Sequence, residues 1–307
     1  MNSEIYFVLT IVAGCALLVA GVQLISNNLL ELFEKPIYKM IRVVREDQNI
    51  TFFKGMFFST ISGSSLVAST TLLNLVNAGL IKLRAANLFL AGANIGPFIL
   101  LGLVIFLNLK LGLVFLSLSI FAQIFVRSRF GKWFQNAQRF LFGLGLICLA
   151  KHFLTDGVRI INGANQGILG NITSGPFLLS FLTGLFFGAL ICYLLRSSLL
   201  TILLFMVVRD GAIISFSLLL PAVIGAHAIG FVHVRKMAEL GNVYSKRLAT
   251  SQLVISLIGF VVGLICLYFS NYIPSTGSGL FVVIFFALLR LVSVLVFIFF
   301  LAPITKI

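Results

Sequence analysis

The sequence predicts an all-α polytopic membrane protein with two inverted-topology repeats, each containing a re-entrant helical hairpin, plus one extra C-terminal helix. Of its 307 residues, 60% are hydrophobic and only 10% are charged, whereas about a quarter of an average globular protein is charged. The charges fall mostly between long uncharged runs. Since one crossing needs about 20 apolar residues, the apolar content is enough for about nine hydrophobic segments.

Charge and motifs exclude other classes. A net charge of +14 would indicate nucleic acid as the partner of a soluble protein, but here the basic residues flank apolar runs, where they orient membrane proteins in the lipid bilayer. The four cysteines stand apart inside apolar runs, so neither a disulfide framework nor a zinc site is expected. The sequence contains no metalloprotease, nucleophile-elbow or phosphate-loop motif, so we expect neither an enzyme nor a cofactor.

The charges of the connections orient the nine apolar segments. Three connections are basic, at 35–45, 127–139 and 235–247, and two are neutral, at 162–175 and 271–278. By the positive-inside rule the basic connections are cytoplasmic, which places the N-terminus outside and the C-terminus in the cytoplasm of a plasma (bacterial inner) membrane. The segments themselves are 5–30, 51–77, 85–109, 111–126, 140–161, 176–208, 212–234, 250–270 and 279–303.

Counting the crossings indicates that two segments do not cross. Three segments lie between the cytoplasmic connections at 35–45 and 127–139, where the number of crossings must be even. Segment 51–77 has a polar, helix-weakening centre at 61–65, so we expect it to be a re-entrant hairpin. The same counting indicates a second hairpin at 176–208, and the alternative is that each is one full helix.

The two halves repeat in sequence. A shift of 133 residues superposes Gly55 on Gly188, Ser64-Ser65 on Ser197-Ser198, and Gly92-Ala93 on Gly225-Ala226. We therefore predict a first repeat over 1–137, an inverted second repeat over 138–272, and a terminal helix within 273–307. Inverted repeats with interrupted helices at matching positions are typical of transporters that bind their substrate near the bilayer midplane. Small residues are also common in membrane helices simply because they allow close packing.

The hairpin tips are the candidate binding site. Helix N-termini attract oxyanions, and the hydroxyls of Ser64, Ser65, Ser197 and Ser198 can donate to an anion or coordinate a small cation. The alternative is that each hydroxyl bonds the carbonyl one turn back in its own helix.

Three further side chains are candidates for the same site. Arg196 lies inside an apolar run, where a charge costs at least about 2.5 kcal/mol and is taken as functional by default, and its fork can bind an anion. Its alternatives are to reach the membrane surface or to pair with Asp156 or Asp210. Asn94 and His227 occupy equivalent positions and can hydrogen-bond a ligand, although a single histidine can equally be a packed structural residue.

The stretch SSLVASTTLLNLVNAGLIKLRAANLFLAGANIG (64–96) resembles the sodium/phosphate cotransporter family of type II-like Na+/Pi symporters. Repeats in that family carry a Gln-Ser-Ser-Ser motif and then Gly-Ala-Asn-Ile-Gly. The resemblance covers about residues 10 to 270 and includes LLRSSLLT (194–201), VIGAHAIG (223–230) and the loop and helix at 235–259. It identifies a divergent member, in which we do not expect the family's C-terminal regulatory domain.

The resemblance implies the site residues and the transported ions. It carries over Ser64, Ser65, Asn94, Ser197 and Ser198 as substrate-binding residues, and it gives Ser65, Ser198 and Thr201 as possible Na+ ligands. Arg196 and His227 depart from the family motif and are added as substrate-binding candidates from the residue pattern itself. The motif glutamines are replaced by Gly63 and Arg196, which makes anion binding better supported than sodium coupling. We thus expect a symporter that imports inorganic phosphate or a similar oxyanion with Na+. The alternatives are a non-transporting protein of the same fold and a transporter of another anion, and the sequence does not give the oligomeric state.

Overall fold

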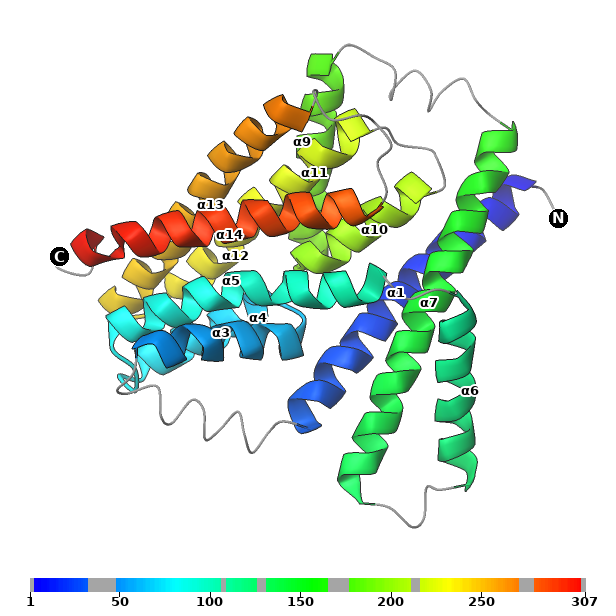
Figure 1. The fold of residues 1–307 in the computed structure, drawn as a ribbon, viewed down its shortest axis with the longest axis horizontal. Helices are drawn as coiled ribbons and strands as arrows, with labels where there is room; N and C mark the ends of the chain where they lie inside the picture. The colour runs from blue at the N-terminus through cyan, green and yellow to red at the C-terminus, as the bar shows by residue number, and fades with distance from the viewer. Residues whose placement is uncertain are drawn as a thin grey trace.

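The computed structural model describes residues 3–32, 48–105, 109–125, 131–164, 177–210, 216–270 and 279–304, and every element in these ranges is an α-helix (Figure 1). Seven stretches are long and apolar enough to cross a membrane: 9–29, 83–102, 132–157, 177–195, 217–238, 243–269 and 281–300. The protein is therefore an all-helical integral membrane protein, as its composition predicts.

Three helices form a group at one end of the molecule (Figure 1). They are α1 (Ser3–Leu32), α6 (Leu109–Phe125) and α7 (Lys132–Ala164). Where α1 crosses α7, a Cβ atom added to Gly21 would lie 2.9 Å from the carbonyl oxygen of Gly143. The crossing therefore requires a residue without a side chain, as in other close helix contacts in membranes.

The first interrupted segment consists of α3 (Gln48–Ser62) and α4 (Ser65–Asn77), followed by α5 (Leu83–Ile105). Gly63 ends α3 with φ 62°, a left-handed conformation that glycine adopts freely. The Ser64 side chain then caps α4 by accepting a hydrogen bond from the Val67 N–H. The Ser26 hydroxyl of α1 donates to the Ser62 carbonyl oxygen, which ties the end of α3 to the α1 group.

The second interrupted segment consists of α9 (Phe177–Leu195) and α10 (Ser198–Asp210). Arg196 lies at the break with φ 53°, and the Ser197 hydroxyl accepts a hydrogen bond from the Leu200 N–H. The next two helices are α11 (Phe216–Ala228) and α12 (Gly230–Ala238). Both segments for which hairpins are predicted are thus interrupted at the residues that the sequence singles out.

Corresponding contacts recur 133 residues apart. In the first half, a Cβ atom added to Gly55 would lie 2.0 Å from the Phe89 carbonyl oxygen, so α3 and α5 touch backbone to backbone. In the second half, Gly188 has the same relation to Ala222, again at 2.0 Å, between α9 and α11. Helices α4 and α10 also match in length, with 13 residues each.

The last two helices are α13 (Val243–Ser270) and α14 (Gly279–Ile304). Helix α14 packs against α13 and lies along α5 (Figure 1), so it joins the helices of both interrupted segments. Its inward face includes fully buried Phe286 and Phe297, and between them lies Arg290, whose side chain is 3% exposed.

The helices differ from the expected segments in two respects. The basic connection predicted at 127–139 is partly helical, because α7 begins at Lys132, and only 239–242 separate α12 from α13. The seven candidate spans equal the seven expected crossings in number, but they are not the same segments. They include α9, which lies in a predicted hairpin, and they leave out the short apolar stretch 109–124, which lies in a segment expected to cross. That stretch falls short because a helix rises only about 1.5 Å per residue.

Candidate functional site

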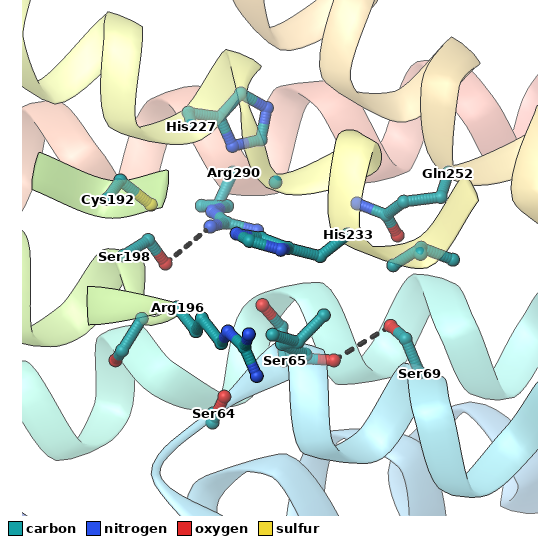
Figure 2. A pocket seen from close by; sticks show the side chains of 14 residues that line it. Ser64, Ser65, Ser69, Cys192, Arg196, Ser198, His227, His233, Gln252 and Arg290 are labelled. Carbon is teal, nitrogen blue, oxygen red and sulfur yellow. Dashed lines mark hydrogen bonds between the residues drawn. The ribbon is translucent and has the colours of Figure 1, made fainter. Parts of the chain in front are cut away.

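The two helix breaks meet at one cavity. Its lining includes Ser64 and Ser65 from the start of α4, and Arg196, Ser197 and Ser198 from the start of α10. Since each break exposes the first N–H groups of a helix, two helix N-termini border the same space, which is where an oxyanion is stabilised. The structure thus brings together the four serines and Arg196 that the sequence predicts as site residues (Figure 2).

Arg196 lies at the mouth of this cavity and is exposed. Figure 2 shows its side chain reaching from the α10 side toward Ser64 and Ser65 of α4. Asp156, one of its two possible partners, lies 3.2 Å from the His152 ring instead. Among the described side chains no carboxylate pairs with Arg196, so its guanidinium can serve an anion.

Arg290 is the strongest feature of the site, and the sequence analysis did not predict it. Its Nη1 donates to Asn94 Oδ1 at 2.7 Å and its Nη2 donates to Ser198 Oγ at 2.9 Å. The Nε atom is buried without a hydrogen-bond partner among the described residues. Arginine has five N–H donors and no acceptor, so a guanidinium lining a cavity with an unused donor can bind an anion.

Asn94 is held in place from two sides. Its side chain is fully buried on α5, and its Nδ2 donates both to the Leu90 carbonyl oxygen at 2.9 Å and to Gln252 Oε1 at 2.9 Å. Gln252 of α13 returns a bond from Nε2 to Asn94 Oδ1 at 3.2 Å. The Asn94 oxygen is therefore fixed where Arg290 needs an acceptor, which makes Asn94 a residue that positions the guanidinium.

His227 lies beside Arg290 and lines the cavity (Figure 2). Its side chain is 2% exposed, and neither ring nitrogen has a hydrogen-bond partner among the described groups. A Cβ atom added to Gly259 of α13 would lie 2.0 Å from the His227 Nε2 atom, so a glycine is required there to make room for the ring. Nearby, Cys192 donates from Sγ to the Ala226 carbonyl oxygen at 3.2 Å.

Thr201 does not join the other predicted cation ligands. It is fully buried, its hydroxyl donates to the Ser197 carbonyl oxygen at 2.9 Å, and it is not part of the cavity lining. Ser198 Oγ accepts from Arg290, and the Ser65 carbonyl oxygen accepts from Ser69 at 2.7 Å. The expected set of Ser65, Ser198 and Thr201 is therefore not brought together around one point in this cavity.

A second group of polar side chains lies beside the mouth of the cavity. His233, which lines the cavity, stacks on the ring of Tyr193 with centroids 4.8 Å apart, and Lys236 Nζ donates to Tyr193 Oη at 2.7 Å. Lys236 and Arg196 together add positive charge beside the cavity. Such charge raises the local concentration of anions.

The cavity has little free space in this conformation. It offers about 20 Å³ to the centres of water-sized molecules, which is room for roughly one water. A tetrahedral oxyanion therefore enters only after the lining moves, and exposed Arg196 is the cavity side chain with the most freedom to do so. The arrangement suits reversible binding of an anion, because the serines and arginines of the lining are hydrogen-bond donors.

Comparisons with known proteins agree with this chemistry. Residues 17–156 match the model of the family described as Na+/Pi-cotransporter. The chain is 28% identical over 258 residues to the "Putative inorganic phosphate export protein YjbB" of Escherichia coli K12, and equally to those of Escherichia coli O157:H7 and Salmonella typhimurium LT2.

Each of these matches covers 83% of this chain but 46% of the relative, so the chain spans about half the length of the curated relatives that it matches. No solved structure matches the chain. Residues 17–156 therefore match a domain of the Na+/Pi-cotransporter family, which is a family of transporters and not of enzymes, and the chain is a distant homologue of the YjbB proteins.

Proposed function

We propose that this protein carries inorganic phosphate, or an oxyanion of similar shape, across the membrane by alternating access, and that the cavity between α4 and α10 holds the anion. The observation that carries the proposal is the cavity lining: two helix N-termini, five serines and two arginines around one space. Each of these groups donates hydrogen bonds, and a phosphate offers acceptors on every side. The family domain and the name of the YjbB relatives support phosphate over other anions.

The proposal includes the two inverted repeats and their re-entrant hairpins. The shared register of 133 residues supports them, because it relates the positive-φ residues Gly63 and Arg196 and the caps Ser64 and Ser197. In this arrangement one interrupted segment enters the membrane from each side, and their tips meet at the cavity. Repeats over 1–137 and 138–272, with the N-terminus outside, are the topology to test by labelling single cysteines placed near Lys82 and Arg84 from each side.

The direction of transport and the coupling ion are separate questions. The sequence resemblance implies sodium-driven import, whereas the curated relatives are named as export proteins. Neither the family domain nor the relatives fix these properties for this chain.

The test is phosphate flux in vesicles containing the purified protein, comparing the natural chain with Arg196→Gly. Glycine is the matched replacement, because Gly63 stands at the equivalent break with φ 62° and adopts this conformation without strain. We expect phosphate affinity to fall about 10- to 100-fold, which corresponds to one lost charge-assisted hydrogen bond. Arg84→Gln, at an exposed arginine outside the cavity, should behave like the natural chain.

Three results would contradict the proposal. Absence of phosphate flux under every ion gradient would indicate a non-transporting protein of the same fold. Flux of another anion with no competition from phosphate would indicate a different substrate. If Arg196→Gly binds phosphate with the same affinity as the natural chain, the arginine lies outside the binding site and the anion binds elsewhere.

A further inference from the structure

Two oxygen atoms that the sequence predicts as ligands of the transported ions are bonded to a cation belonging to the protein. Arg290 reaches Asn94 Oδ1 of α5 at 2.7 Å and Ser198 Oγ of α10 at 2.9 Å. One of these oxygens comes from each half of the chain. The guanidinium therefore lies where the two halves meet, beside the cavity that both helix breaks line.

This positive charge is not neutralised by the protein. The Arg290 side chain is 3% exposed, and no carboxylate pairs with it among the described residues. Arginine stays protonated in proteins, and a buried charge without a counter-charge is unfavourable. A neighbouring Phe286 ring, whose centroid is 5.1 Å from the Arg290 Cζ atom, stabilises the charge only weakly. The missing counter-charge is what an anionic substrate supplies.

The same charge opposes a sodium ion. A second unit charge about 4 Å away would be disfavoured about 1000-fold in occupancy, the equivalent of about 4 kcal/mol at an effective dielectric constant of 20. The oxygen atoms that would coordinate Na+ do not compensate for this repulsion, because Ser198 Oγ already accepts a hydrogen bond from Arg290 and the Thr201 hydroxyl is bonded within its own helix. The residues predicted to hold Na+ therefore do not fit that ion in this structure.

We propose that the Arg290 guanidinium is a built-in counter-cation that takes the place of Na+, so that the protein carries the oxyanion without sodium. This inference rests on the proposed function. Because the charge of Arg290 stays with the protein through a complete cycle, the net charge moved is that of the anion. A membrane potential that is negative inside then drives the anion outward, with an equilibrium ratio of about 50-fold per 100 mV for each elementary charge.

The first test measures release of labelled phosphate from proteoliposomes in sodium or choline salts, with the potential set by potassium and valinomycin. We expect release rates that agree within about twofold in the two salts and that increase when the interior is negative. A tenfold or greater requirement for Na+ overturns the proposal. If the release rate does not change with the membrane potential, the statement that the anion moves without a coupled ion is overturned.

The second test needs no phosphate and so separates this inference from the proposed function. Thermal unfolding of the purified protein is compared in sodium chloride and choline chloride for the natural chain, Arg290→Ala and Arg290→Lys, with Arg84→Ala as the control at an exposed arginine. Only Arg290→Ala should have a higher thermal midpoint in sodium chloride than in choline chloride. It alone frees the two oxygen atoms that Arg290 binds and the space that the guanidinium occupies. Arg290→Lys keeps a tethered cation and should stay indifferent to sodium.

The outcomes of the second test are distinct. A midpoint that rises with Na+ in the natural chain means that the ion binds beside Arg290, and the proposal fails whatever the phosphate result. If Arg290→Ala does not fold, Arg290→Lys and the natural chain still decide the question through the same comparison of salts. If phosphate is neither bound nor moved in any salt, the proposed function fails while the sodium comparison still reports on the counter-cation.

Discussion

Replacing Asn94 by Asp tests whether the charge of Arg290 binds the anion. The change is nearly isosteric, and it places a carboxylate where the amide oxygen now accepts from Arg290 Nη1 at 2.7 Å. At pH 8 an aspartate beside a guanidinium is ionised. The variant therefore neutralises Arg290 from within, without removing it and without changing the volume of the site.

The size of the effect follows from the geometry. A carboxylate about 4 Å from the guanidinium charge attracts it by about 4 kcal/mol at an effective dielectric constant of 20. An anion about 5 Å from the new carboxylate is repelled by about 3 kcal/mol on the same basis, which weakens its binding roughly 150-fold. The variant loses the two bonds that Asn94 Nδ2 donates, each of which contributes about 1 kcal/mol, so the ion pair offsets that loss and the fold should stay stable.

The assay measures the phosphate dissociation constant and the thermal midpoint of the same purified protein. Asn242→Asp is the control, because it introduces the same charge where the Asn242 oxygen already accepts from the Ser245 N–H at 2.9 Å, at the start of a helix, which favours a carboxylate. We expect weak phosphate binding with a retained midpoint in Asn94→Asp. Asn242→Asp should bind phosphate with natural affinity, although it too loses bonds that the amide donates, to the Val76 and Asn77 carbonyl oxygens. Natural affinity in a folded Asn94→Asp protein would show that the anion does not depend on Arg290.

Two further predictions concern the packing and the helix breaks. Gly225→Val should lower the thermal midpoint strongly, by the equivalent of at least about 3 kcal/mol, because its Cβ would lie 2.2 Å from the Leu185 carbonyl oxygen; Gly102→Val, with nothing within 4 Å of the added Cβ, should do so far less, and equal midpoints would refute the close helix contact. Ser64→Ala and Ser197→Ala should each cost about 1 kcal/mol of stability through the lost cap and should weaken phosphate binding as well. A loss of stability in either variant with no change in affinity would make that serine a cap only.

The helix breaks could be predicted from sequence because their cause is local. Gly63 favours the left-handed conformation, and a serine that follows it caps the next helix through its own backbone neighbours. In the second half Arg196 adopts the same conformation without glycine's freedom, and there the count of crossings indicated the break, in agreement with the register that places Arg196 on Gly63. The re-entrant topology stays a prediction, because helix length and composition do not say which segments cross.

Thr201, predicted as a possible Na+ ligand, lies outside the cavity lining for a reason that is also local. A threonine in a membrane helix can donate to the carbonyl one turn back, and the Thr201 hydroxyl does so, to the carbonyl oxygen of Ser197. The resemblance suggests a cation ligand, whereas the hydrogen-bonding need of a buried hydroxyl is met within its own helix. For Ser198, two positions after the break, the same local bond is not what the structure shows: its oxygen accepts from another helix.

Arg290 escaped the sequence analysis although the criterion that selected Arg196 applies to it with more force. It lies within a 26-residue helix of high hydropathy, where an arginine costs about 2.5–3.5 kcal/mol on insertion scales. It lies in a segment without a counterpart in the repeat, so its position gave no reason to connect it with the serines. Only the packing of α14 along α5 shows that this charge meets Asn94 from one half and Ser198 from the other.

This placement explains why such an arginine can be tolerated at all. Its two bonds to neutral oxygens do not repay the removal of a full charge from water, which costs several kcal/mol even after relaxation. The empty protein is destabilised by this unpaired charge, and an anion bound in the cavity offsets the destabilisation. Arg290 is thereby a residue whose energy differs between the empty and the loaded site, which is the property that a substrate-binding charge requires.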